Sequence, residues 1–249
     1  MSRDWDAATY DRVSAPQVEW ARNVLERLPL RGDETVLDAG CGSGRVTQLL
    51  LERLPRGHVV AVDSAPSMVE HAREALDPER ATVIQASLTE LELDEPVEAA
   101  FSNAVFHWVP DHDALFARIH AALRPGARLV AQCGGEGNVE RFHDAAKAVG
   151  AEPPYADYLR GWQGPWNFAA AQETAERLER AGFTEVETWL EPYPVTPPDP
   201  TGFLRTVCLG HHLEQLPEEL RAPYVAAVRE RCGTELDYVR LNIQAKTGC

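Results

Sequence analysis

The run VLDAGCGSG, residues 36–44, has the residue types of a ligand-binding turn. Two apolar residues lead into Asp38, and the alternate positions that follow are glycines, Gly40, Gly42 and Gly44. Glycine has no Cβ, so the backbone at these positions can approach a bound molecule closely. The pattern predicts a strand with a carboxylate at its tip, then a ligand-binding turn, then a helix.

The spacing of the glycines bears on which ligand the turn holds. Glycines at alternate positions form GxGxG, whereas a dinucleotide-binding turn of the GxGxxG type counted from Gly40 needs a glycine where Arg45 stands. The spacing therefore weighs against a nicotinamide cofactor and an oxidoreductase.

A second carboxylate ends the next apolar run. Asp63 closes HVVAVD, residues 58–63, and lies 19 positions after Gly44. A carboxylate at a strand tip can accept hydrogen bonds from both hydroxyls of a ribose. The alternative is an N-cap for the helix expected over residues 64–76, but Ser64 can cap that helix itself. We therefore expect Asp63 to contact the ligand.

The elements that position these residues alternate along the first half of the chain. Short apolar strands followed by amphipathic helices indicate an α/β fold with a parallel sheet covered on both faces. Strands are expected near residues 35–39, 58–62, 81–85, 99–103, 127–133 and 183–190.

The second half of the chain departs from this alternation. Residues 151–168 are rich in aromatic residues and proline, and we expect either a lid over the site or a plug at the edge of the core. Five prolines fall within residues 192–200, ahead of helices near 200–213 and 217–232. Residues 239–246 then alternate apolar and polar side chains, which predicts a last strand with one solvent-exposed side.

Composition limits the partners and the compartment. The 249 residues hold 24 Lys and Arg against 39 Asp and Glu, a net charge of −15 that disfavours nucleic acid as a partner. With no apolar run of membrane-spanning length and no signal-type N-terminus, we expect a cytoplasmic protein without a membrane segment. The five cysteines are scattered and include no CxxC pair, so neither a disulfide framework nor a metal site is expected.

The glycine turn in its DxGxGxG form, Asp63 and the stretch FSNAVFHWVPDHDALFARIHAALRPGARLVAQ, residues 101–132, resemble class I S-adenosylmethionine-dependent methyltransferases of the trans-aconitate methyltransferase-like group. The resemblance is close over residues 5–135 and looser beyond. It implies a Rossmann-like, doubly wound sheet of seven strands, mostly parallel with an antiparallel last strand, and a small helical lid. One domain, 1–249, is implied, with an N-terminal lid (1–20), a cofactor-binding core (30–135) and substrate-capping insertions (151–168 and 196–235).

S-adenosylmethionine is the cofactor that the resemblance implies. The family places Asp63 on the ribose and Asn103 beside the methyl group. Ser87 stands where the family usually has Asp at the adenine, so binding loses a charge-assisted hydrogen bond and is expected to be weaker. Tyr10 either closes over the cofactor or anchors the N-terminal segment. The cofactor residues expected are Asp38, Gly40, Cys41, Gly42, Gly44, Asp63, Ser64, Met68, Ser87, Leu88, Asn103 and Tyr10.

The resemblance further implies methyl transfer to a small molecule, with a carboxylate oxygen as the acceptor. A carboxylate is ionised near pH 7 and needs no base, whereas a phenol or an ammonium group does. His107, in the loop after the fourth strand, is the candidate base, or it only packs against or hydrogen-bonds the substrate. Trp108, Trp162 and Trp166 are expected to line the substrate side.

Other functions stay open at this point. One is N-methylation or phenolic O-methylation in secondary metabolism, and another is a non-catalytic cofactor-binding protein. A cation beside the cofactor would favour an acidic substrate, and an all-aromatic wall a neutral or phenolic one. A monomer or a homodimer is expected. Possible anchors for an anionic substrate are Arg12, Arg141, Arg160, Arg205, His211 and His212.

Overall fold

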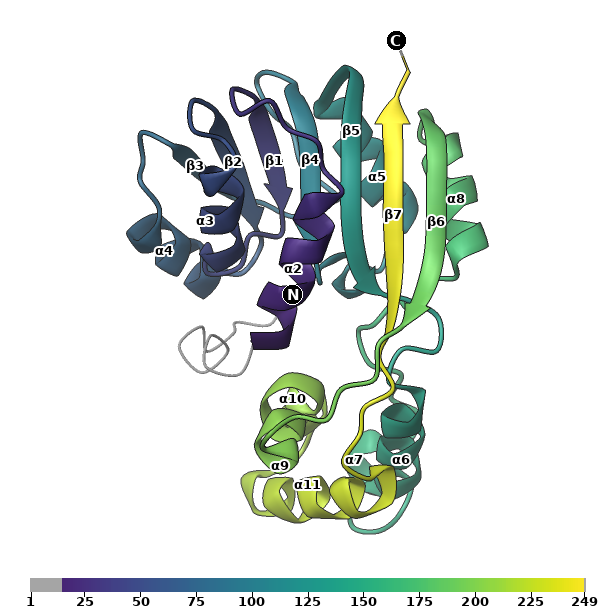
Figure 1. The fold of residues 1–249 in the computed structure, drawn as a ribbon. Coiled ribbons are helices and arrows are strands. Elements are labelled where there is room, and N and C mark those ends of the chain that lie inside the picture. Colours follow the sequence, from purple (N-terminus) through teal and green to yellow (C-terminus); the bar gives the residue numbers. More distant parts are fainter. Residues whose placement is uncertain (1–14, 249) are drawn as a thin grey trace.

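The computed structural model describes residues 15–248, and within them a single seven-stranded sheet in the order β3-β2-β1-β4-β5-β7-β6 (Figure 1). Strand β7 runs antiparallel to both of its neighbours, whereas β1 to β5 pair in parallel. The predicted sheet, with its antiparallel last strand, is therefore confirmed. The strands are β1 (Thr35–Ala39), β2 (His58–Asp63), β3 (Ala81–Gln85), β4 (Val97–Asn103), β5 (Leu123–Gly134), β6 (Phe183–Pro192) and β7 (Val239–Thr247).

Strand β1 lies at the point where the strand order reverses. In register, Asp38 of β1 stands opposite Ala61 of β2 on one side and Phe101 of β4 on the other. The carboxyl ends of these parallel strands therefore meet at one edge of the sheet. In open α/β sheets this edge, at the reversal of strand order, is where ligands bind.

Helices cover both faces of the sheet because successive side chains of a strand point to opposite faces. Val36 packs in a core with α2 (Ala15–Glu26), α3 (Arg45–Glu52) and α4 (Pro66–Ala75). Its neighbour Leu37 packs in the core on the other face, which α5 and α8 complete. The bounds of those two helices are His112–Ala121 for α5 and Ala171–Arg180 for α8. The doubly wound arrangement follows from this alternation.

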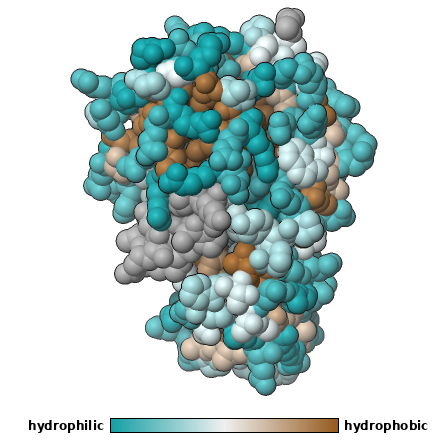
Figure 2. All heavy atoms as spheres, viewed as in Figure 1, coloured by the Kyte–Doolittle hydropathy of each residue, from teal (hydrophilic) through white to brown (hydrophobic). Residues whose placement is uncertain are grey.

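A separate hydrophobic core forms a helical cap below the carboxyl ends of the strands (Figure 1). The face shown in Figure 2 is largely hydrophilic, with hydrophobic residues visible over the sheet and in a smaller patch where the sheet meets the cap. The cap includes α6, which lies outside the insertions predicted from the sequence, because Phe142 of α6 is buried in the same core as Tyr224 of α11. Its elements are α6 (Glu140–Gly150), α7 (Ala156–Leu159), α9 (Pro200–Phe203), the short helical segment η2 (Leu204–Cys208), α10 (Gly210–Gln215) and α11 (Glu218–Cys232).

Two local predictions are wrong. The polar side of β7 is not solvent-exposed at its start, since Arg240 is 2% exposed and Asn242 is fully buried. The reason is that β7 lies inside the sheet, between β5 and β6, and Arg27, the residue that follows α2, donates a hydrogen bond to Asn242. Ser64 does not cap α4 either, because the N-cap position is Ala65, without a side-chain hydrogen bond. Among the described residues, no helix is long and apolar enough to cross a membrane.

Candidate functional site

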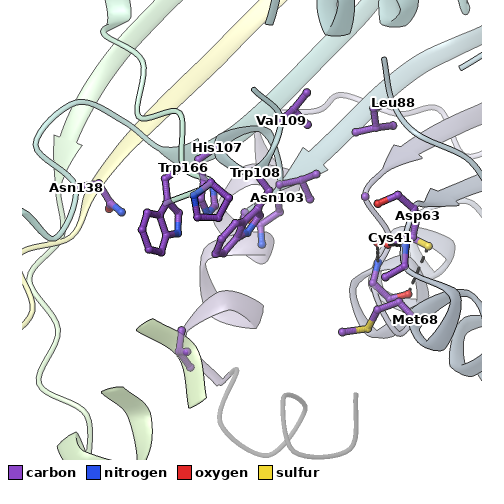
Figure 3. A pocket seen from close by; sticks show the side chains of 18 of the residues that line it. Cys41, Asp63, Met68, Leu88, Asn103, His107, Trp108, Val109, Asn138 and Trp166 are labelled. Carbon is purple, nitrogen blue, oxygen red and sulfur yellow. Dashed lines mark hydrogen bonds between the residues drawn. The ribbon is translucent and has the colours of Figure 1, made fainter. Parts of the chain in front are cut away.

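A cavity of about 670 Å³ lies between the carboxyl ends of the strands and the cap. Figure 3 shows Asp63, Cys41 and Met68 on one side of it and His107, Trp166 and Asn138 on the other. We call these the turn side and the aromatic side. The residues predicted from the sequence that line the cavity are Asp38, Gly40, Cys41, Gly42, Asp63, Ser64, Met68, Ser87, Leu88, Asn103, His107, Trp108 and Trp166.

Gly44 and Trp162 do not line the cavity. Gly44 has a positive φ of 86° at the N-cap of α3, and a Cβ there would lie 3.1 Å from Leu76, so it serves the packing of the turn. Trp162 packs against the cap core, with its ring centroid 4.6 Å from that of His212. Tyr10 lies outside the described residues.

The glycine turn is held against the end of β2. The backbone N–H groups of Gly40 and Cys41 both donate to the Val62 carbonyl, at 2.8 and 2.9 Å. A Cβ on Gly40 would come within 2.3 Å of Val105, whereas a Cβ on Gly42 would meet nothing within 4 Å. Gly40 is thus required by packing, and Gly42 faces open space where a bound molecule can approach the backbone.

Asp63 joins the turn to the start of α4. Its Oδ2 accepts a hydrogen bond from Gly42 N at 2.9 Å, and its Oδ1 accepts one from Ala65 N at 2.9 Å. Burial raises the pKa of Asp63, and these backbone donors oppose the rise. A carboxylate has about four acceptor positions, so Asp63 can still accept from hydroxyl groups of a ligand. Its role on a ribose stays a prediction.

Asp38 is a second buried carboxylate in the cavity wall. It is 1% exposed, and its Oδ2 accepts a hydrogen bond from the Thr47 hydroxyl at 2.7 Å. Burial raises the pKa of Asp38 to about 7, with Thr47 lowering it and the charge of Asp63 raising it further. Among the described residues no cationic side chain forms an ion pair with Asp38 or Asp63. The turn side is therefore suited to a ligand that carries positive charge.

The loop after β3 closes the turn side. The hydroxyls of Ser87 and Thr89 are 2.8 Å apart, and Ser87 Oγ accepts a longer hydrogen bond from Thr89 N at 3.3 Å. Leu88 between them is buried. This loop therefore offers two hydroxyls and an apolar side chain, and no charge.

His107 is built as a hydrogen-bond donor. It lies in the short helix η1 (Phe106–Trp108), and its Nδ1 accepts the backbone N–H of Gly134 at 3.2 Å. Burial, and then the charge of Arg240, hold the pKa of His107 well below 6.5. The ring is therefore neutral, and because Nδ1 is the acceptor its proton is on Nε2. A general base needs a free lone pair, so this geometry favours the hydrogen-bonding interpretation of His107 over the base.

Residues 151–168 act both as a plug and as cavity wall. Trp162 is packed in the cap core, whereas Trp166 and Phe168 line the cavity and stack with their ring centroids 6.5 Å apart. His107 stacks on the Phe168 ring at 5.8 Å, and the His143 ring of α6 meets Trp166 at 4.7 Å. These rings form the aromatic side, of which Figure 3 labels His107 and Trp166.

Arg240 is a residue of the cavity wall that sequence reasoning missed. Its Nε donates to Gln132 Oε1 at 3.4 Å, and its guanidinium carbon lies 4.5 Å above the ring of Trp20. Of the anchors expected from the sequence, His211 lines the cavity. Arg141 does not, and instead pairs on the surface with Glu235 at 3.0 Å. The place of β7 in a covered sheet was the signal that its polar residues are buried.

Comparison with known proteins agrees with this geometry. A methyltransferase domain family matches residues 36–126. The trans-aconitate 2-methyltransferase of Azoarcus sp. is 33% identical, over 90% of this chain and 87% of the relative. That of Variovorax paradoxus is 30% identical, over 92% and 88%. The chain belongs to the class I S-adenosylmethionine-dependent methyltransferases. A solved structure of this methyltransferase fold, Haemonchus contortus phosphoethanolamine N-methyltransferase 2, shares 18% identity and a TM-score of 0.65, over 98% of this methyltransferase and 57% of that chain.

The residues of this methyltransferase fit S-adenosylmethionine. The cofactor carries a sulfonium and an ammonium cation, and the turn side provides two buried carboxylates, Asp38 and Asp63. Gly42 leaves open backbone where the cofactor can approach. The hydroxyls of Ser87 and Thr89 lie on the same wall and can hydrogen-bond a base. Ser87 offers a hydroxyl on this wall in place of a carboxylate.

Proposed function

We propose that the protein transfers a methyl group from S-adenosylmethionine to a carboxylate oxygen of a small acid with at least two carboxyl groups. The observation that carries this proposal is the guanidinium of Arg240 in the cavity wall. A buried arginine is suited to bind a carboxylate through two parallel hydrogen bonds. The names of the relatives support an acid, since trans-aconitate is a tricarboxylate.

The chain contributes binding and alignment to the reaction. When bound, S-adenosylmethionine supplies an electrophilic methyl group on a sulfonium. The glycine turn and Asp63 would hold the cofactor, and Asn103, at the end of β4 between the two sides of the cavity, would lie near the methyl group. A carboxylate nucleophile is already ionised, so in-line positioning and exclusion of water by Trp108 and Trp166 account for catalysis without a base.

Arg240 suits a carboxylate other than the one that is methylated. As the attacking oxygen forms its bond to carbon it loses negative charge, so an ion pair to that oxygen weakens toward the transition state. Such an ion pair would stabilise the ground state more than the transition state and slow the reaction. An ion pair to a second carboxylate keeps its strength throughout. This is why the proposed acceptor has at least two acid groups.

The test is turnover of a panel of small acids that includes trans-aconitate, followed by release of S-adenosylhomocysteine and by mass spectrometry of the ester. In Arg240→Met the KM for the acid should rise about 10- to 100-fold, the range expected for hydrogen bonds to a charged group, with the Kd of the cofactor unchanged. Arg205→Met is the matched control, because Arg205 is exposed on the cap and does not line the cavity.

Preferred turnover of an amine or a phenol over every acid in the panel would refute the proposal. So would an Arg240→Met variant whose KM for the acid equals that of the wild type. A pH-rate profile with a histidine-like fall on the acid side would indicate a base, and with it the N- or phenolic O-methyltransferase alternative.

A further inference from the structure

Trp20 forms part of the cavity wall from the helix α2, on the side of Arg240. Its side chain is 2% exposed, and its ring meets Tyr193 and Tyr238 edge-on, with centroids 5.5 and 5.1 Å away. The guanidinium of Arg240 covers one face of the ring at 4.5 Å. The indole is thus fixed by neighbours from β7 and from the segments that join the sheet to the cap.

The indole N–H of Trp20 has no hydrogen-bond acceptor among the described residues, although it is fully buried. Buried donors in native proteins nearly always have a partner, because an unmade hydrogen bond is costly. A phenylalanine would supply an aromatic face for Arg240 and the edges for Tyr193 and Tyr238 without that cost. A tryptophan in the wall of a ligand cavity therefore points to an acceptor that arrives with the ligand.

We propose that the indole N–H of Trp20 donates a hydrogen bond to the carboxylate that Arg240 pairs with, the one that is not methylated, and so determines specificity for an acid. The inference deepens the proposed function and rests on it. The N–H and the guanidinium together offer only donors. A carboxylate can satisfy both through its two oxygens, whereas a methyl ester or a primary amide offers one carbonyl oxygen and no charge.

A buried network holds the two donors in place. Gln132, which accepts from Arg240, donates through Nε2 to Asn242 Oδ1 at 2.7 Å. Arg27, the residue that follows α2, donates to the same oxygen. Trp20 in α2 and Arg27 just after its end therefore both contact side chains of β7. The relative position of Trp20 and Arg240 is therefore fixed before any ligand binds.

The test is Trp20→Phe, which removes the N–H and keeps an aromatic ring. Two quantities are measured on the enzyme loaded with S-adenosylhomocysteine or S-adenosylmethionine: the Kd of tricarballylate, a saturated tricarboxylate, by calorimetry, and the KM of the acid that the wild type methylates. Both should rise about tenfold or more, while the Kd of the cofactor and kcat stay within about twofold. The preference for the acid over its amide should fall by the same factor.

A stability measurement separates this role from a structural one. Because Trp20→Phe removes an unsatisfied buried donor, the Tm of the ligand-free protein should be unchanged or higher. Trp162→Phe is the matched control, since Trp162 is packed in the cap core and does not line the cavity. It should leave the Kd of tricarballylate unchanged.

The outcomes distinguish the two proposals. Weaker tricarballylate binding by Trp20→Phe than by the wild type supports the role of Trp20. If the wild type also methylates none of the acids, the proposed function is refuted and the role of Trp20 in binding still stands. Equal tricarballylate affinity in Trp20→Phe and wild type overturns the role of Trp20. So does a lower Tm with an unchanged KM, which would make the indole structural. Absence of tricarballylate binding to the wild type overturns both.

Discussion

The carboxylate of Asp38 should destabilise the ligand-free protein above neutral pH, and Asp38→Asn tests this. Asp38 is 1% exposed, its one side-chain partner in the described structure is the Thr47 hydroxyl at 2.7 Å, and burial raises its pKa to about 7. Asparagine has nearly the same shape, can still accept from Thr47, and carries no charge at any pH. The substitution therefore removes the buried charge with little change in packing.

The sign and the size follow from proton linkage. The ordinary pKa of the group is 3.8, so between pH 3.8 and about 7 the folded protein keeps a proton on Asp38 that the unfolded chain has lost. The stabilising contribution of that proton is fully present below pH 3.8 and is lost as the pH rises through about 7. The gap corresponds to about 4 kcal/mol, since one pKa unit is worth about 1.4 kcal/mol. Asp38→Asn should thus be more stable than the wild type at pH 8 by up to about 4 kcal/mol, and by almost nothing at pH 4.

Urea unfolding of both proteins at pH 5 and pH 8 measures this difference. Glu34→Gln is the control of opposite sign. Burial raises the pKa of Glu34, but the backbone N–H groups of Arg31, Gly32 and Asp33 donate to it and give a net lowering. The stability that Glu34 contributes is present above its unfolded pKa and is lost as the pH falls through its folded pKa. Glu34→Gln should therefore lower stability at pH 8.

The cofactor should reverse the effect at Asp38. A cationic ligand favours the charged form, so its binding to the wild type near pH 7 should release a proton, and Asp38→Asn should bind it more weakly without that release. Calorimetry in two buffers of different ionisation enthalpy measures the proton. The reasoning is refuted where Asp38→Asn is no more stable than the wild type at pH 8, or where both proteins release the same number of protons on binding.

The other predictions concern His107 and the glycine turn. With His107 neutral and its proton on Nε2, kcat/KM for the acid, measured at saturating S-adenosylmethionine, should be flat from pH 6 to 9. In His107→Gln the amide can donate from a similar position, so turnover should stay within about tenfold of the wild type. His107→Phe has no donor and should lose about 10- to 100-fold. Complete loss of turnover in both variants would instead indicate that His107 is a general base. Gly42→Ala should weaken cofactor binding at least tenfold. Gly126→Ala is the control, because Gly126 also has a positive φ and open surroundings but lies outside the cavity. Both substitutions should lower the free energy of unfolding by about 1–2 kcal/mol, and Gly126→Ala should leave cofactor binding intact. An equal loss of binding in both variants would assign the effect to backbone strain.

The turn side of the site could be predicted from the sequence because it is local. Asp38, the glycines after it and Asp63 all lie at the ends of strands whose apolar runs are easy to recognise. Parallel strands bring those ends to one edge whatever the rest of the chain does. Gly44 shows the limit of this reasoning, since the same spacing that indicates a ligand turn also serves the packing of α3 against Leu76.

The rest of the cavity wall depends on contacts between distant segments, and sequence reasoning, which found His107, Trp108 and Trp166, did not find Arg240 or Trp20. Alternation along β7 shows that Arg240 and Asn242 share a face, but it does not say whether water or a helix covers that face. Trp20 has the helical spacing of an ordinary core residue, and only the structure shows that its N–H lacks a partner. The resemblance implied an antiparallel last strand, but the expectation that its polar side faces solvent was wrong, and Arg240 was therefore missed.

The two sides of the cavity therefore differ in how they can change. The cofactor half comes from consecutive strands, between Asp38 and Asn103, and a substitution there disturbs the sheet itself. The acceptor half is assembled from α2, the segment around Trp166, the start of β7 and the cap. Methyltransferases with names as different as trans-aconitate 2-methyltransferase and phosphoethanolamine N-methyltransferase are similar to this chain in sequence or in fold. Because the acceptor half can be altered without moving the strand ends, substitutions confined to Trp20, Arg240 and the cap should change the acceptor while the affinity for the cofactor stays constant.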